Sequence, residues 1–255
     1  MDTLNCFSFL DKTMNILIAD DEPIILDMLS DVFGGKGLYN VFAAKDAKKA
    51  LAIITSEVRI HVCILDLGLS DVHNDEFYLL KTFAPFISFL VHTGTSEPLK
   101  GFRCKELGAK LLIDKGNTMN LYAGQFIALV NNYGLQNIIN PSYSEKAGGT
   151  LNYATEVLFS ASPASVTEWA MKTNITDREL RHLWKIKVGI TARHALALYS
   201  LFSMAFKCIG KGISGKCTER VCSIADNDKF EMLRNYYLTH RSAMKKILQT
   251  PIIPH

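Results

Sequence analysis

Polar side chains stand at the ends of several apolar segments in the first half of the chain, where they could act together on one ligand. Asp20 and Asp21 follow one such segment, Asp66 follows a second, Thr93 ends a third and Lys115 comes just after a fourth. Three carboxylates brought together repel one another unless a cation neutralises them, and hard oxygen ligands of this type suit Mg²⁺. These residues therefore predict a magnesium site, provided that the fold brings them together.

The spacing of apolar residues indicates the elements that would position these side chains. Apolar runs alternate with amphipathic stretches between residues 14 and 134, which is typical of a parallel sheet covered by helices on both faces. The predicted strands are residues 15–19, 39–43, 62–65, 86–92 and 110–113, and the predicted helices are 24–33, 47–56, 76–83, 98–107 and 121–132. The pattern predicts an α/β fold, a doubly wound five-stranded parallel sheet. Since chemistry in such sheets gathers at the carboxyl ends of the strands, the polar residues should meet at one edge.

Four segments of this half, taken in order, resemble the receiver domain of bacterial response regulators. They are ILIADDEP at 16–23, CILDLGL at 63–69, LVHTG at 90–94 and GAKLLIDK at 108–115. The resemblance covers nearly half of the chain and implies a flavodoxin-like receiver domain over residues 14–134. It also implies a protein of two-component signalling that is phosphorylated by a sensor histidine kinase.

Carried over residue by residue, the resemblance makes Asp66 the carboxylate nucleophile that accepts phosphate. The implied magnesium ligands are three side chains and one backbone carbonyl: Asp20, Asp21, Asp66 and Gly68. Lys115 and the Thr93 hydroxyl would donate to the transferring phosphoryl oxygens, where negative charge spreads. After phosphorylation Thr93 would move toward the new oxygens and shift its loop. The chain is not expected to be an enzyme beyond this phosphorylation and dephosphorylation of its own receiver.

Four positions depart from the family's usual residues. The family has proline at 70, glycine at 74, an aromatic at 112 and proline at 116, where this chain has Ser70, Asn74, Leu112 and Gly116. Asparagine tolerates the left-handed backbone that glycine supplies, so position 74 is a mild change. Leu112 matters more, because the aromatic there is the family's usual partner for the moving threonine. Coupling from Asp66 to the output surface is therefore expected to be weakened or built differently, and a receiver that no longer accepts phosphate is the alternative.

The second half of the chain differs in charge and in pattern. Residues 151–255 contain 15 Lys or Arg and 8 Asp or Glu, a net charge of +7, whereas residues 1–150 carry −4. This asymmetry indicates that only the second half meets a polyanion. Pro141, Gly148 and Gly149 interrupt regular structure before it, so residues 135–150 are predicted to be a linker and 151–255 an all-helical domain.

A helix-turn-helix is predicted between residues 165 and 189. One helix should cover 166–172 and a tight turn 173–175, and a second helix should begin at a Thr176–Glu179 capping box and end at Gly189. By helical spacing its inward-facing side chains are Leu180, Leu183, Trp184 and either Lys187 or Val188. Its outward-facing side chains, predicted to contact DNA, are Arg178, Arg181, His182 and Lys185. An ordinary helical hairpin with a solvated cationic face is the alternative.

Residues 151–206 also carry a resemblance to a known family. The matching positions are Ala170, Thr176, Leu180, Trp184, Lys185, Gly189 and the helix predicted at 191–206. They resemble the first half of the AraC/XylS-type DNA-binding domain, which implies two helix-turn-helix units that bind double-stranded DNA and are bridged by that helix. The second unit is divergent, and its faint traces are Ile224, Ala225, Phe230 and residues 236–241.

Together these features predict a transcriptional regulator in which phosphorylation of Asp66 changes how receivers associate, for example as a homodimer, and so how the helices meet DNA. The alternative is a phosphorylation-controlled signalling adaptor whose helical domain binds a protein partner. No apolar run reaches the roughly 18 residues that cross a bilayer, and the first residues lack the cationic flank of a secretory signal. We therefore expect a cytoplasmic protein with no membrane partner. The scattered cysteines predict reduced thiols and no zinc site.

Overall fold

The computed structural model describes residues 10, 13–34, 37–69, 75–94, 97–118, 123–141, 143, 149–213 and 227–249 of the chain. The first half contains one parallel sheet with the strand order β2-β1-β3-β4-β5. Its strands are β1 (Met14–Ala19), β2 (Tyr39–Ala44), β3 (Val62–Leu65), β4 (Ser88–Thr93) and β5 (Leu111–Asp114). All of the predicted strands are present close to their predicted limits, which confirms the doubly wound five-stranded sheet.

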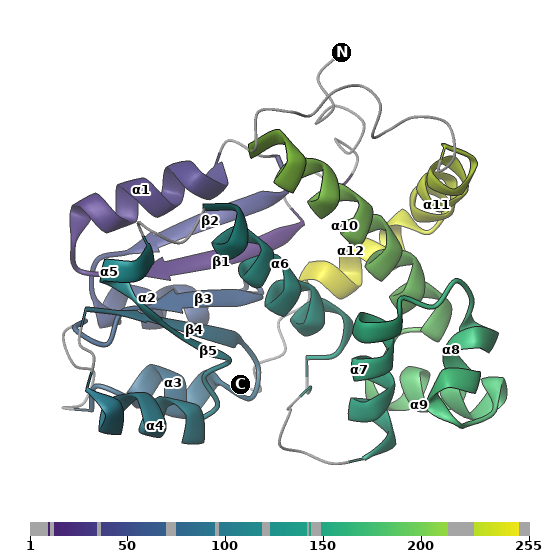
Figure 1. The fold of residues 1–255 in the computed structure, drawn as a ribbon, viewed down its shortest axis with the longest axis horizontal. Coiled ribbons are helices and arrows are strands. Elements are labelled where there is room, and N and C mark those ends of the chain that lie inside the picture. Colours follow the sequence, from purple (N-terminus) through teal and green to yellow (C-terminus); the bar gives the residue numbers. More distant parts are fainter. Residues whose placement is uncertain are drawn as a thin grey trace.

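Helices cover both faces of this sheet (Figure 1). The helices of the first half are α1 (Pro23–Gly34), α2 (Ala47–Ile54), α3 (Tyr78–Phe83), α4 (Pro98–Glu106), the short α5 (Lys115–Thr118) and α6 (Ala123–Ile139). Buried side chains of α1 and α6 pack with one face of the sheet, and those of α2, α3 and α4 pack with the other. The three central strands β1, β3 and β4 are buried on both faces, as their continuous apolar runs predict, whereas the edge strands β2 and β5 are partly exposed.

α6 is longer than predicted and overruns the predicted linker. The expected helix ended at residue 132 and the linker began at 135, whereas α6 continues to Ile139. Gly134 lies inside the helix, and a Cβ there would come within 2.6 Å of the Met14 sulfur and 3.0 Å of Val62. Glycine at this position therefore lets α6 lie close against β1 and β3, and it does not end the helix. The linker prediction is wrong for residues 135–139.

The second half is helical through its described residues, as predicted. Its helices are α7 (Thr150–Ala161), α8 (Val166–Thr173), α9 (Asp177–Lys187), α10 (Ala192–Ile213), α11 (Asn227–Thr239) and α12 (Arg241–Gln249). α8 and α9 are the predicted helical pair, and Asn174 takes a left-handed conformation between them, with φ of 58°. The predicted capping box at the start of α9 is present, with Thr176 and Glu179 each accepting the other's backbone N–H.

Two tryptophans form the core of this helical pair. The rings of Trp169 on α8 and Trp184 on α9 meet edge to face, with their centroids 4.5 Å apart. The Trp169 indole N–H donates to the carbonyl of Ala154 on α7 at 2.8 Å. Both rings are fully buried, so each removes a large apolar area from water. Leu180 is buried beside them, Leu183 and Val188 are half-buried, and Lys187 is exposed.

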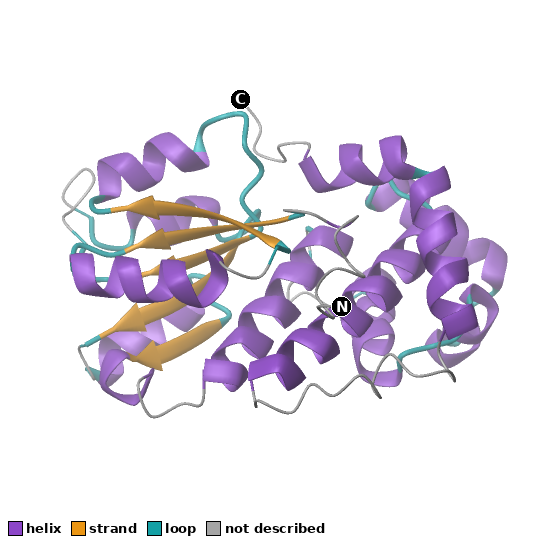
Figure 2. Cartoon of the chain, turned by 90° about the horizontal axis from the view of Figure 1, so that it is seen from above, coloured by secondary structure: helices purple, strands orange, loops and turns teal. Residues whose placement is uncertain are grey.

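The two halves of the molecule share one hydrophobic core. α6 packs along α10, and buried side chains of both helices belong to the same cluster as one face of the sheet (Figure 1). The imidazole Nε2 of His61 lies 2.9 Å from the carbonyl oxygen of Leu248 on α12. Figure 2 shows the sheet and the helical half side by side, and buried contacts join them in addition to the covalent chain.

The predicted second helix-turn-helix unit falls on α11 and α12. Phe230 lies in α11, and residues 236–241 span the junction between the two helices, whereas Ile224 and Ala225 lie outside the described residues. One end of α12 packs against the first half through Leu248, which is buried. Within the described part of the chain, no helix combines the length and the hydropathy that crossing a membrane requires.

Candidate metal centre and nucleic-acid interface

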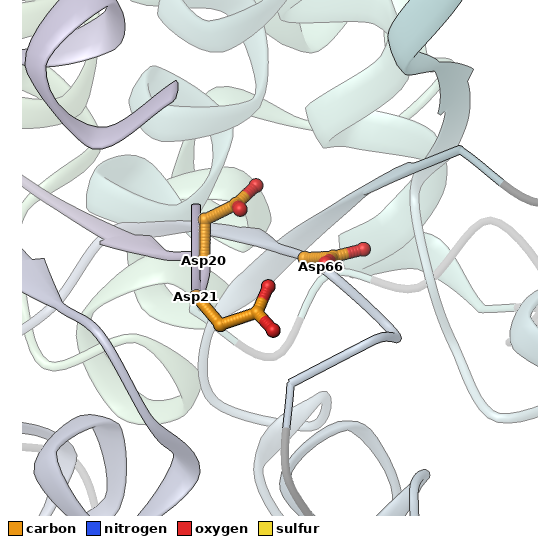
Figure 3. A group of neighbouring side chains, drawn as sticks. All are labelled: Asp20, Asp21 and Asp66. Carbon is orange, nitrogen blue, oxygen red and sulfur yellow. The ribbon is translucent and has the colours of Figure 1, made fainter. Parts of the chain in front are cut away.

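The three predicted carboxylates meet at the carboxyl edge of the sheet. β1 and β3 are hydrogen-bonded neighbours that pair Ala19 with Leu65, so the residues that follow these strands emerge side by side. Asp20, Asp21 and Asp66 each offer a carboxylate oxygen, and these oxygens lie within 4.8 Å of one another (Figure 3). The Asp66 backbone N–H also donates to the Ala19 carbonyl at 2.8 Å, which holds the two strand ends together.

Lys115 balances part of this negative charge. Its ammonium group lies 3.0 Å from Asp20 Oδ2, 3.1 Å from Asp66 Oδ2 and 2.7 Å from Glu22 Oε1. Burial alone would lower the pKa of Lys115, but its hydrogen bonds to the three carboxylates raise the pKa above its ordinary value. Lys115 is therefore a fixed cation beside Asp66, able to contact a group that forms on that carboxylate.

Asp20 indicates why this cluster would accept a further cation. Burial raises the pKa of the Asp20 carboxyl, against the backbone N–H of Glu22 and the Lys115 ammonium, which both lower it. A buried carboxylate remains ionised only where positive charge compensates its lost hydration. The cluster offers carboxylate oxygens alone, and two of its members are buried. This donor set fits the predicted Mg²⁺ better than it fits a metal that prefers nitrogen or sulfur.

Gly68 and Thr93 lie at the same edge. A Cβ on Gly68 would stand 2.9 Å from Asp66 Oδ2, so glycine keeps the space beside this carboxylate open. Thr93 is the buried last residue of β4, the strand next to the one that Asp66 follows. The metal-binding role of the Gly68 carbonyl and the hydroxyl role of Thr93 stay predictions.

Two further residues lie beside this site and were given no role from the sequence. Glu22 contributes the shortest of the Lys115 contacts, and its signal was its place directly after the acidic pair. His92 is 1% exposed, and its Nδ1 lies 4.0 Å from Asp20 Oδ2. Burial, and after it the charge of Lys115, lower the pKa of His92 to about 4, so its imidazole is neutral near pH 7.

The departures from the usual family residues fall in different places. Leu112 points away from the carboxylates and toward α4. Its side chain is 44% exposed, and its Cδ2 lies 2.9 Å from the position that a Cβ on Gly101 of α4 would take. The backbone N–H of Gly116 donates to Asp114 Oδ1 at 2.7 Å. Ser70 and Asn74 lie outside the described residues.

The predicted DNA-contacting side chains share the outer face of α9. Arg178, Arg181, His182 and Lys185 are all exposed, as their helical spacing predicts. Arg181 forms an ion pair with Asp177 one turn earlier, and Asp177 also accepts a hydrogen bond from Thr167 at 2.9 Å. Arg181 would have to leave this pairing to reach a base, so Arg178 and Lys185 are the more accessible cations of the surface.

Comparison with known proteins concerns the first half of the chain. Residues 16–122 match the family model of the response regulator receiver domain. Among solved structures, a CheY-like receiver domain protein from Methanospirillum hungatei JF-1 is 23% identical with a TM-score of 0.43, covering 49% of this chain and 95% of its own. The chemotaxis protein CheY4 from Vibrio cholerae is 23% identical with a TM-score of 0.41, covering 47% of this chain and 98% of its own. No curated protein is significantly similar to the chain. The family match ends before α6, so it carries no information on the helical half.

Proposed function

We propose, from the premise that residues 16–122 form a response regulator receiver domain, that this chain is a phosphorylation-controlled transcriptional regulator. Asp66 accepts a phosphoryl group from a sensor histidine kinase, and the helical half binds double-stranded DNA. The observation that carries the first part is the contact of Lys115 with the clustered carboxylates of Asp20 and Asp66. The chain catalyses no reaction other than the phosphorylation and dephosphorylation of its own receiver.

The phosphoryl transfer follows from the positions of these side chains. An Asp66 carboxylate oxygen attacks phosphorus as the bond from phosphorus to the donor's imidazole nitrogen breaks, and the imidazole leaves with the electron pair. Lys115, now 3.1 Å from Asp66 Oδ2, turns its N–H groups to the incoming phosphoryl oxygens. A magnesium ion held by Asp20, Asp21 and Asp66 supplies the remaining neutralising charge when bound. The open space beside Gly68 accommodates the added group.

Labelling by a small phosphodonor such as acetyl phosphate tests the acceptor. In the presence of Mg²⁺ the intact mass should rise by one phosphoryl group, and Asp66→Ala should abolish the increase. Asp31→Ala, a change of an exposed carboxylate on α1, serves as the matched control and should label normally. Labelling that persists in Asp66→Ala would place the acceptor elsewhere, and an unlabelled wild-type protein would make this a receiver that no longer accepts phosphate.

DNA binding is tested by retention of genomic fragments in a gel at increasing salt. Affinity should fall steeply with salt, because each phosphate contacted releases counterions. Arg181→Ala should weaken specific binding by roughly 1 to 3 kcal/mol if this side chain reads a base, and by a small sequence-independent amount if it contacts phosphate. Lys48→Ala, which removes an exposed cation of the first half, should leave binding unchanged. Absence of retention at low salt would refute the DNA-binding role.

A signalling adaptor is the second candidate, and one observation favours it. Ile186, one turn after His182 on α9, is 63% exposed, and Met171 on α8 is 74% exposed, so the helical pair presents large apolar side chains as well as cations to solvent. Such side chains are common at protein interfaces. If DNA retention fails, a partner protein whose binding is lost in Ile186→Glu would identify the adaptor.

A further inference from the structure

We propose that His92 couples the state of the Asp66 site to α6, and through α6 to α10 of the helical half. This inference rests on the proposed function, since it concerns what phosphorylation of Asp66 does to the rest of the molecule. His92 acts as a positioning residue, whose ring transmits a displacement between two neighbours.

The placement of His92 makes it a bridge. Along β4, Leu90 packs in the core that contains α1 and α6, whereas Phe89 and Val91 pack in the opposite core. Since side chains alternate along a strand, His92 points to the same face as Leu90. Its Nδ1 lies 4.0 Å from Asp20 Oδ2, and its ring centroid lies 6.3 Å from that of Phe126 in the first turn of α6. One buried ring thus lies between a carboxylate of the site and the start of α6.

The far part of α6 is held against the sheet by close packing and by buried hydrogen bonds. Gly134 lies against Met14 and Val62, with no room for a side chain between helix and sheet. Asn137 accepts from Arg59 at 3.0 Å through its carbonyl and donates to the Phe86 carbonyl at 2.8 Å through its side-chain amide. A shift at Phe126 would therefore tilt α6 about this clamped end instead of sliding the helix.

Phosphorylation supplies the displacement. The phosphoryl group takes up hydrogen bonds of Lys115, which now contacts Asp20 and Asp66 together, so the surroundings of Asp20 change. Thr93, expected to move toward the phosphoryl oxygens, is joined to His92 by one peptide bond. Both events act on the same imidazole. Because packed interiors switch between discrete arrangements, a small shift there can change how α6 packs against α10.

Leu112 marks the competing route and provides the control. It lies on the face of the sheet that α4 covers, whereas His92 and Phe126 lie on the face that α6 covers. A signal through β5 and α4 would depend on Leu112, whereas a signal through α6 would not.

Hydrogen–deuterium exchange of the full chain, with and without acetyl phosphate in Mg²⁺, tests the proposal. In the wild type, phosphorylation should change exchange over residues 123–139 and 192–206 by about five- to 150-fold, the range of typical couplings between sites. His92→Val should still be labelled on Asp66 but should lose this change, and Leu112→Ala should keep both. Phe126→Leu, which removes the ring at the other end of the contact, should also be labelled and lose the change, so the test does not depend on one variant.

The outcomes separate this inference from the proposed function. A wild type that is not labelled refutes the proposed function and leaves no signal to transmit. A labelled wild type with unchanged α6 and α10, or a labelled His92→Val that keeps the change, overturns the inference alone. Loss of the change in Leu112→Ala likewise overturns it, because the signal would then pass through β5 and α4.

Discussion

Acidification should weaken the contact between the first half and α12, because His61 is buried in this contact as a neutral imidazole. Its Nδ1 accepts the backbone N–H of Asn15 at 2.9 Å, so Nε2 carries the proton and donates to the Leu248 carbonyl at 2.9 Å. A second proton would have to bind Nδ1, where it would point at the backbone N–H of Asn15, which is itself a donor. Burial, and after it the charge of Arg59, hold the pKa of His61 well below its ordinary 6.5.

The sign and size of the effect follow from proton linkage. The unfolded chain binds a proton at His61 near pH 6.5, whereas the folded chain does not, so stability is fully present above pH 6.5 and falls as pH drops below it. One such site loses about 1.4 kcal/mol per pH unit, or about 2 kcal/mol between pH 7 and pH 5. His92, whose pKa is lowered to about 4, also lowers the stability of the wild type as the pH falls. The contribution of His61 is therefore obtained by comparing the wild type with a variant that lacks only His61.

Urea unfolding, followed by fluorescence of the buried Trp169 and Trp184, measures this difference. His61→Gln removes the titrating group while its amide can still accept and donate at the two positions. This variant should lose about 2 kcal/mol less than the wild type between pH 7 and pH 5. His182→Gln, a change of an exposed histidine on α9, should behave as the wild type. Equal losses in the wild type and in His61→Gln would refute the buried neutral contact.

Two further substitutions test the packing and capping of helices. Gly134→Ala would put a methyl group 2.6 Å from the Met14 sulfur and should cost roughly 1 to 3 kcal/mol in urea unfolding, whereas Gly124→Ala in the same helix meets nothing within 4 Å and should stabilise slightly. Equal stability of the two variants would mean that α6 does not lie against the sheet at Gly134. Thr176→Ala should cost about 1 kcal/mol of stability by removing the cap of α9, and Thr176→Ser, which keeps the hydroxyl, should not. Equal losses in the two Thr176 variants would contradict the capping role.

The parts of the fold that the sequence predicted well are those with a local signal. The strand of residues 62–65 matches β3 at both ends, because four apolar residues lead directly into an acidic one. The carboxylate cluster followed once the strands were known, since parallel neighbours end at one edge. The capping box of Thr176 and Glu179 was equally readable, as both partners lie within one helical turn.

Contacts distant in sequence were not predictable in this way. His61 and Leu248 are 187 positions apart, and neither is unusual in its local pattern. The continuation of α6 past residue 132 was not predicted, because glycine ordinarily weakens a helix, whereas the close approach of β1 and β3 requires Gly134 in this one. The role of His92 was missed for a similar reason, since its partner Phe126 lies on another element.

These distant contacts change what a phosphorylation signal has to do. A flexible linker over residues 135–150 would leave the helical half free, and regulation would then depend on how receivers associate. Instead α6 continues through residues 135–139 and shares a core with α10, while α12 is held to the first half by the contact of His61 with Leu248. The α9 surface is therefore carried on a body packed against the receiver. A change at Asp66 can then reach that surface within one molecule by repacking α6 against α10, or by releasing one half from the other, which would expose their shared apolar core to water.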